Sequence, residues 1–230
     1  MSRVLAIPDL QYPFAHPDHL EFLKAVKKKF KPTHVVCLGD EVDFHALSQH
    51  DHDPDGYSPG HELDKALEDM KRLYDVFPKV MAVTSNHTER PLRRAFKFGI
   101  PRAFLRSYHE FLKAPKGWEW RDQWKVDNVR YLHGEGWSGR NGAINAAENA
   151  ATSTVIGHLH SHAGIQYSAN SERLIFGFNV GCLIDYKAYA FAYGKFCKNK
   201  PILGAGIIEN GVPLFIPMLL SKSGKWTRKI

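Results

Sequence analysis

Short runs of apolar residues, each followed by polar residues, recur through the first third of the chain. Residues 4–7, 34–38 and 80–83 have the length and composition of buried strands. Residues 18–31 and 61–77 lie between them and carry apolar side chains at helical spacing, with Asp18 as the expected N-cap of the first helix. This alternation of strand and helix predicts a largely parallel sheet.

The pattern then changes twice. Residues 89–113 read as a helical stretch that Gly99 and Pro101 interrupt, and its five arginines predict a basic helical cap at the edge of a site. The remainder is rich in strand patterns, and it ends in a hairpin around Asn210-Gly211. The expected strands are 118–124, 129–133, 154–156, 165–167 paired with 174–178, and 206–209 paired with 212–216, with one helix at 143–151. No linker or repeat divides the chain, so residues 1–230 are expected to form one domain.

Composition narrows the class of protein. Of the 230 residues, 43% are hydrophobic and 24% charged, which fits a globular protein and excludes collagen-like, disordered and disulfide-rich classes. The net charge of +7 favours polyanionic partners without identifying one, and the sequence gives no indication of oligomeric state. Three cysteines in no paired spacing, with no signal peptide and no membrane-spanning run, indicate a reducing compartment, and we expect a cytoplasmic protein without a membrane partner.

Polar residues of selected types follow the predicted strands. They are Asp9 and Gln11, then Gly39-Asp40 and Asp43, then Asn86-His87, then His133, and finally His158 and His160. Loops beyond the carboxyl ends of parallel strands converge on one crevice, so these side chains are expected to form a metal site. Oxygen and imidazole donors without a thiolate suit Mn²⁺, Fe or Zn²⁺ rather than a structural zinc.

The spacing of His158 and His160 favours two ions. On an extended segment their side chains point to opposite faces, which argues against a single shared ion. Asp40 can bridge two metals, and a hydroxide held between them is positioned for in-line attack on phosphorus. The expected reaction is therefore hydrolysis of a phosphomonoester or phosphodiester.

The same residues carry a family resemblance. The ordered set Asp9-x-Gln11, Gly39-Asp40-x-x-Asp43, Asn86-His87, His133-Gly134 and Gly157-His158-x-His160 resembles the calcineurin-like metallophosphoesterase superfamily over residues 9–160. That family's pattern is D-x-H, G-D-x-x-D, G-N-H-D/E, H and G-H-x-H. The resemblance implies an α/β fold of four layers, αββα, in which two mixed sheets pack face to face with helices outside.

The resemblance also implies a role for each residue. Asp9, Gln11 and His160 would hold the first metal, Asn86, His133 and His158 the second, and Asp40 would be shared. His87 would act as general acid toward the leaving oxygen, with Asp43 orienting it, a role that suits an imidazole near neutral pH.

The sequence departs from the family pattern at four points. Gln11 replaces a histidine, and an amide oxygen in place of an imidazole favours Mn²⁺ or Mg²⁺; Mn²⁺ is the expected ion, with Mg²⁺, Fe or Zn²⁺ as alternatives. Gln11 has the alternative role of capping the turn before Pro13. Ser85 replaces glycine and Thr88 replaces an acid, which removes no expected ligand. Phe44-His45 replaces the Arg-Gly of protein Ser/Thr phosphatases and disfavours that activity.

Substrate contacts are less defined by the sequence. Arg90, close behind His87, is a candidate phosphate ligand, and His45 is another. The polar cluster of His45, His50, Asp51, His52, Asp53 and His61 reads as a solvated loop or, as the alternative, a pocket lining. His16, His19, His34 and His109 are expected at the surface or on helices without a role.

The substrate class and the function each leave alternatives. The basic charge favours nucleic acid or a nucleotide as substrate, although a small phosphoester fits as well. A catalytically weak or inactive binding scaffold of the same fold is the alternative function. A metallo-β-lactamase-like hydrolase is disfavoured because Ser161-His162 stands where that fold has an Asp-His pair.

Overall fold

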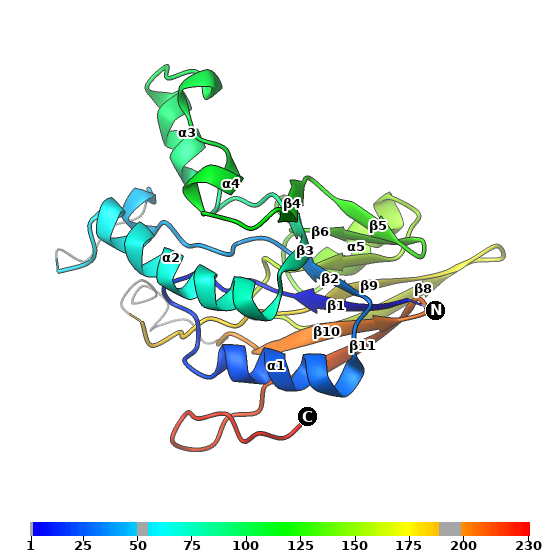
Figure 1. The fold of residues 1–230 in the computed structure, drawn as a ribbon. Helices are drawn as coiled ribbons and strands as arrows, with labels where there is room; N and C mark the ends of the chain where they lie inside the picture. The colour runs from blue at the N-terminus through cyan, green and yellow to red at the C-terminus, as the bar shows by residue number, and fades with distance from the viewer. Residues whose placement is uncertain (1, 50–54, 189–198) are drawn as a thin grey trace.

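The computed structural model describes residues 2–49, 55–188 and 199–230, which form two β-sheets with helices on their outer faces (Figure 1). Six strands make the first sheet: β1 (Arg3–Ile7), β2 (His34–Cys37), β3 (Lys79–Val83), β4 (Gly117–Arg121), β10 (Gly204–Glu209) and β11 (Val212–Pro217). Five make the second: β5 (Trp124–Val126), β6 (Val129–Leu132), β7 (Thr154–Ile156), β8 (Gly164–Ala169) and β9 (Leu174–Asn179). The strand orders are β11-β10-β1-β2-β3-β4 and β5-β6-β7-β9-β8.

Both sheets are mixed, with a parallel centre. Strands β1 to β4 run parallel in the first sheet, while β10 and β11 are antiparallel to their neighbours. In the second sheet β6, β7 and β9 run parallel, and β5 and β8 are antiparallel edges. The parallel strands of each sheet therefore end at one edge, where the sequence places its polar motifs.

Alternation along β1 shows how the two sheets pack. Leu5 and Ile7 are fully buried on the face that carries the helices, whereas Val4 and Ala6 are buried against the second sheet. A strand that is covered on both faces reads as a continuous apolar run, which is the pattern of residues 4–7. The four-layer αββα fold that the family resemblance implied is confirmed.

The outer layers are three helices. The helices α1 (His19–Phe30) and α2 (Pro59–Val76) cover the first sheet through buried side chains such as Leu23 and Met70, and α5 (Gly142–Asn149) covers the second (Figure 1). A Cβ on Gly177 of β9 would lie 2.2 Å from the backbone nitrogen of Ile144. Glycine at this position is what lets α5 pack directly on the strand.

The interrupted helical stretch forms an arm that stands away from the sheets (Figure 1). It consists of α3 (Arg90–Lys97), the 3₁₀ turn η2 (Arg102–Phe104) and the short helix α4 (Tyr108–Phe111). Helix α3 ends before Gly99, whose φ of +71° favours glycine, so the predicted interruption is confirmed. Another 3₁₀ turn, η1 (His45–Leu47), lies beside α2 and α3.

Three details differ from the sequence predictions. Asp18 is the N-cap residue of α1, as predicted, but its carboxylate makes no capping hydrogen bond; its Oδ2 accepts instead from the backbone nitrogen of Trp226 at 2.9 Å. The segment 118–124 is not one strand but parts of β4 and β5, which belong to different sheets. His16 is neither at the surface nor on a helix: it is buried and contacts the carbonyl of Gly224 at 3.0 Å. His19 lies on α1, within the expectation, and is buried with Tyr12 Oη at 2.7 Å.

Within the described ranges, no helix is long and apolar enough to cross a membrane.

Candidate functional site

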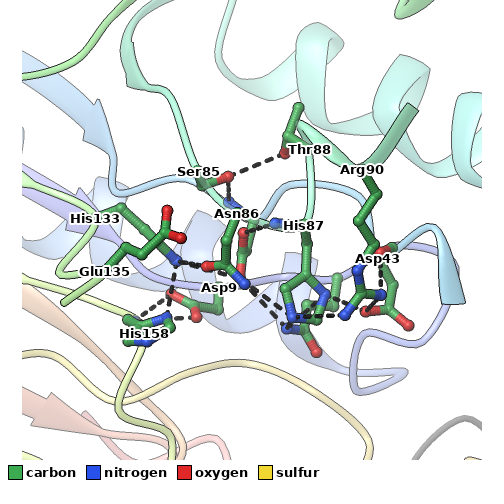
Figure 2. Close-up of polar contacts among 12 residues, drawn as sticks. Asp9, Asp43, Ser85, Asn86, His87, Thr88, Arg90, His133, Glu135 and His158 are labelled. Carbon is green, nitrogen blue, oxygen red and sulfur yellow. Dashed lines mark hydrogen bonds and ion pairs between the residues drawn. The ribbon is translucent and has the colours of Figure 1, made fainter. Parts of the chain in front are cut away.

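The predicted motifs meet at the carboxyl ends of the parallel strands. Asp9 follows β1, Asp40 follows β2, and His133 follows β6, while the segments with Asn86-His87 and with His158 and His160 follow β3 and β7. Contacts across the two sheets join them: both carboxylate oxygens of Asp9 lie 3.1 Å from the backbone nitrogen of His158 (Figure 2). All nine predicted metal-binding and catalytic side chains therefore lie in one cluster.

The first group of metal-binding atoms is formed by Asp9, Asp40 and His160. One potential ligand atom from each lies within 4.8 Å of the other two. Asp9 is fully buried, and its Oδ2 lies 2.8 Å from His160 Nε2. These three residues and Gln11 are the four that the sequence assigns to the first ion.

The second group consists of Asp40, His133 and His158 by the same criterion. His133 Nε2 lies 2.7 Å from Asn86 Oδ1, 3.1 Å from His158 Nδ1 and 3.3 Å from Asp40 Oδ2. Asp40 belongs to both groups, as expected for a bridging carboxylate. His158 and His160, two residues apart, contribute to different groups, which is the division that the two-ion interpretation requires.

The groups around His133 favour a positive charge at its Nε2. Its Nδ1 faces the carbonyl of Leu38 at 2.8 Å, which fixes a proton there and leaves Nε2 toward the cluster. Burial lowers the pKa of His133, but Asp40 and the other acceptors around it prevail and raise the pKa to about 10. For Asp40, burial raises the pKa, and His133 and His87 lower it well below its ordinary value. A proton on Nε2 thus occupies the centre of a set of ligand atoms, where a metal ion would replace it.

Gln11 has an orphaned polar atom. Its Nε2 lies 3.5 Å from Asp40 Oδ2 and 3.4 Å from His87 Nδ1, and its Oε1 is buried without a hydrogen-bond partner. An unpaired buried oxygen is costly in a folded protein, and coordination by an ion would satisfy it after rotation of the amide. The residue therefore fits a first ion, although the alternative role in the turn before Pro13 stays open.

Backbone conformation gives independent support for the cluster. Gln11, Asp40 and His158 all have positive φ, at 48°, 50° and 64°, a region that costs a non-glycine residue free energy. Gly39, at φ +92°, allows the turn into Asp40, because a Cβ there would lie 2.5 Å from Ser85 Cβ. The chain thus holds three predicted ligands in strained conformations at one place, as active sites commonly do.

His87 lies beside the two metal-binding groups and faces Asp43. Its Nδ1 hydrogen-bonds Asp43 Oδ1, and its backbone nitrogen donates to Asp40 Oδ1 at 3.0 Å (Figure 2). Burial lowers the pKa of His87, while Asp40 and Asp43 more than offset that effect and raise it above its ordinary value. The predicted orientation of His87 by Asp43 is the geometry observed.

Arg90 occupies the other side of the same imidazole. Its Nη2 lies 3.1 Å from His87 Nε2, and its Nη1 donates to the carbonyl of Asp43 at 2.8 Å. A guanidinium only donates hydrogen bonds, so His87 Nε2 must accept and the ring proton lies on Nδ1. A second proton on His87 therefore requires Arg90 to turn away, for example toward an anion.

Sequence reasoning missed a buried network behind these loops. Glu41 Oε2 accepts from Thr88 Oγ1 at 2.8 Å, Thr88 accepts from Ser85 Oγ at 3.1 Å, and Ser85 Oγ accepts from the backbone nitrogen of Asp40 at 2.6 Å. Glu41 Oε1 accepts from Trp120 Nε1 at 2.9 Å, and burial raises the pKa of Glu41 to about 7. Thr88 thus bonds a buried carboxylate from the segment that carries Asp40. The sequence signal for this network is the presence of Glu41 directly after Asp40.

An open cavity of about 490 Å³ borders the cluster. Its lining includes Asn86 and His158, the arginines of α3 (Arg90, Arg93 and Arg94), and Glu135. The cavity is large enough for a small phosphoester, and its lining joins basic side chains to two predicted ligands.

The second predicted substrate residue does not line this cavity. His45 is buried, with its ring edge against Phe14 and its Nδ1 3.9 Å from Asp43 Oδ2, so its place is behind the site. His61 is exposed and packs on Tyr57. The remaining members of that cluster, residues 50–53, lie outside the described residues.

Among known proteins, only solved structures match the chain: no family model and no curated protein does. Among solved structures it is similar to Yfce, a phosphoesterase from E. coli, with 17% identity, a TM-score of 0.43 and coverage of 99% of this chain and 98% of that one. It is also similar to Vacuolar Protein Sorting 29 from Cryptosporidium parvum, with 15% identity, a TM-score of 0.41 and coverage of 93% and 95%. It is similar as well to Vps29 from Chaetomium thermophilum, with 12% identity, a TM-score of 0.48 and coverage of 99% of this chain and 94% of that one. Because each TM-score is below 0.5, we base no inference on these likenesses.

Proposed function

We propose that the protein is a metal-dependent phosphoesterase with a centre for two divalent ions, for which Mn²⁺ is the favoured metal. The observation that carries this proposal is the pair of potential metal-binding groups that share Asp40. Asp9, Gln11 and His160 would hold one ion, and Asn86, His133 and His158 the other. Two ions bound in this way supply Lewis-acid stabilisation of phosphoryl oxygens and lower the pKa of a water nucleophile.

The chain's own residues then have distinct tasks. Arg90 leaves Asp43 and His87 to contact an anionic phosphoester, which frees His87 Nε2. Asp43 holds the Nδ1 proton and keeps the ring oriented. His87, whose pKa Asp40 and Asp43 raise, then carries the proton on Nε2 that the leaving oxygen takes.

Hydrolysis of two chromogenic substrates tests the proposal. Wild-type protein should hydrolyse bis-p-nitrophenyl phosphate or p-nitrophenyl phosphate with Mn²⁺ and lose this activity in chelator. Asp40→Asn removes the shared carboxylate and should abolish turnover. Asp64→Asn, the same change on the exposed face of α2, is the matched control and should leave turnover intact.

The role of His87 has a more specific test. A general acid matters most when the leaving group is a poor one, so His87→Ala should reduce hydrolysis of phenyl phosphate more than that of p-nitrophenyl phosphate. The larger loss should approach about 10²-fold, a typical contribution of general acid catalysis. His34→Ala, at the exposed start of β2, is the control. Equal losses on both substrates would show that His87 is not the proton donor and would not contradict the two-ion centre.

The alternative function has its own outcome in the same assay. If the folded protein hydrolyses neither substrate, whether or not it binds Mn²⁺, the result would support a binding scaffold.

The compartment is part of the proposal too: Cys37 and Cys182 are free and buried, which suits the reducing cytoplasm.

A further inference from the structure

The outer part of the arm is strongly basic. Residues 93–106 contain five basic residues and no acidic one: Arg93, Arg94, Lys97, Arg102 and Arg106. Arg93 pairs with Glu89 and Glu135 at the base of α3. In the part of the chain that the structure describes, no carboxylate lies within 4.0 Å of the other four. Arg94 donates to the backbone carbonyls of Leu47 and Ser48, so the charges available to a partner are those of Lys97, Arg102 and Arg106.

Aromatic side chains stand among these cations and face solvent. Phe98 is 75% exposed, Phe104 79% and Phe96 49%. The guanidinium of Arg102 lies 5.8 Å from the centre of the Phe96 ring, so charged and aromatic groups share one surface. Along the chain, Lys97, Arg102 and the 41% exposed Ile100 lie among these rings, so the surface mixes aromatic, aliphatic and cationic groups.

The arm leads into the cavity of the candidate site. Helix α3 contributes Arg90, Arg93 and Arg94 to the cavity wall and continues outward to Lys97. At 1.5 Å per residue, Lys97 lies about 10 Å beyond Arg90 along the helix axis. Basic side chains thus extend from the tip of the arm to the cavity lined by Asn86 and His158, where Arg93 pairs with Glu135, which also lines that cavity.

We propose that the arm binds single-stranded nucleic acid and guides it to the site, with phosphates on the arginines and bases stacked on Phe98 and Phe104. This inference rests on the proposed function, because it names the substrate class of that phosphoesterase. Nonspecific single-strand binding combines a basic track with aromatic faces, both of which are present here. Duplex is a poorer fit, because its bases are stacked on one another and do not present their faces to side chains.

A second copy of the chain is the less suitable occupant of this surface. Two arms of like charge would repel each other, and the net charge of +7 adds to that repulsion. A single-stranded nucleic acid offers phosphates to the cations and bases that can stack on the aromatic rings.

Binding of a fluorescent oligothymidylate, measured by anisotropy in chelator, tests the inference without hydrolysis. Wild-type protein should bind it more tightly than a duplex of equal length, and added salt should weaken both. Phe98→Ala with Phe104→Ala should weaken single-strand binding at least about fivefold. Lys97→Gln with Arg102→Gln should weaken it and reduce its salt dependence.

Matched pairs elsewhere on the surface provide the controls. Leu174→Ala with Val212→Ala removes apolar groups that are 66% and 64% exposed on the sheets, and Lys125→Gln with Lys222→Gln removes two exposed charges. These should leave oligonucleotide binding unchanged. Arm variants that bind as well as these controls would overturn the inference. So would sedimentation showing a dimer that Phe98→Ala disrupts, since the surface would then belong to self-association.

The two proposals fail separately. Binding in chelator needs no chemistry, so absence of turnover on bis-p-nitrophenyl phosphate leaves the binding result interpretable. In Mn²⁺, the arm variants should lose more activity on the oligonucleotide than on bis-p-nitrophenyl phosphate.

Discussion

Gly157 is the position where one added methyl group should disable the metal centre. It follows β7 directly, and a Cβ there would lie 2.2 Å from Asp9 Oδ1 and 3.4 Å from Asp9 Cγ. Its φ lies outside the left-handed region, so alanine is compatible with the backbone and the effect comes from the contact alone. To reach an ordinary contact distance, the carboxylate must retreat by about 1 Å, a displacement large enough to cost about 10²-fold in rate.

Gly157→Ala should therefore affect the metal more than the fold. We expect Mn²⁺ affinity, measured by calorimetry, to fall about 10- to 100-fold, since Asp9 loses its position beside His160. Turnover of bis-p-nitrophenyl phosphate should fall about 10²-fold at limiting Mn²⁺ and recover partly as Mn²⁺ is raised. The free energy of unfolding in chelator should fall by about 1–3 kcal/mol, the usual cost of overpacking.

Gly60→Ala is the matched control for this experiment. A Cβ on Gly60 meets nothing within 4 Å in the first turn of α2, so both affinity and turnover should be unchanged. If Gly157→Ala keeps wild-type Mn²⁺ affinity while losing stability, Asp9 is not a ligand and the assignment of the first ion is wrong.

Three further outcomes follow from the same contacts. Gln11→His places an imidazole where an amide oxygen lies unpaired, so calorimetry should show a larger gain in affinity for Zn²⁺ than for Mg²⁺; an equal gain would contradict a ligand role. Mn²⁺ binding should release about one proton below pH 9, because the pKa of His133 is about 10 without metal. Calorimetry in buffers of different ionisation enthalpy measures this proton release. If no proton is released, His133 is not a metal ligand. Burial raises the pKa of Glu41 from 4.5 to about 7, so its stabilising contribution is complete below pH 4.5 and lost as pH rises through 7. Urea unfolding in chelator should lose up to a few kcal/mol between pH 5 and pH 8, and Glu41→Gln should flatten that slope; an unchanged slope would assign the loss to other groups.

The sheets and the cluster could be predicted from sequence because both depend on local order along the chain. Each buried strand is a short apolar run, and each predicted metal motif follows such a run, so the topology of the first sheet brings Asp9 and Asp40 together, and the packing of the second sheet on the first adds His133. His158 and His160 do contribute to different groups, but alternation on an extended segment is not the reason: His158 has a φ of +64° and His160 lies in a turn, so the segment is not extended.

The contacts that the sequence could not predict are those to a distant segment of the chain. Asp18 accepts a hydrogen bond from Trp226, 208 positions away, and His16 contacts Gly224 in the same terminal segment. Neither contact leaves a periodic signal near Asp18 or His16. The contact of Arg90 with His87 is different: the residues are close in sequence, but only the side-chain geometry shows that the guanidinium faces Nε2.

The arm has a consequence for how such a protein can diversify. Strands β3 and β4 are parallel neighbours, so some crossover of at least about a dozen residues must join them in any variant of this fold. Here that obligatory crossover is extended outward, and its tip contributes Phe98 and Phe104 to no core. If the arm binds substrate as proposed, exchange of the tip residues can alter the choice of partner without disturbing Asp40 or the sheets, so that recognition and chemistry would lie on separately replaceable parts of the chain.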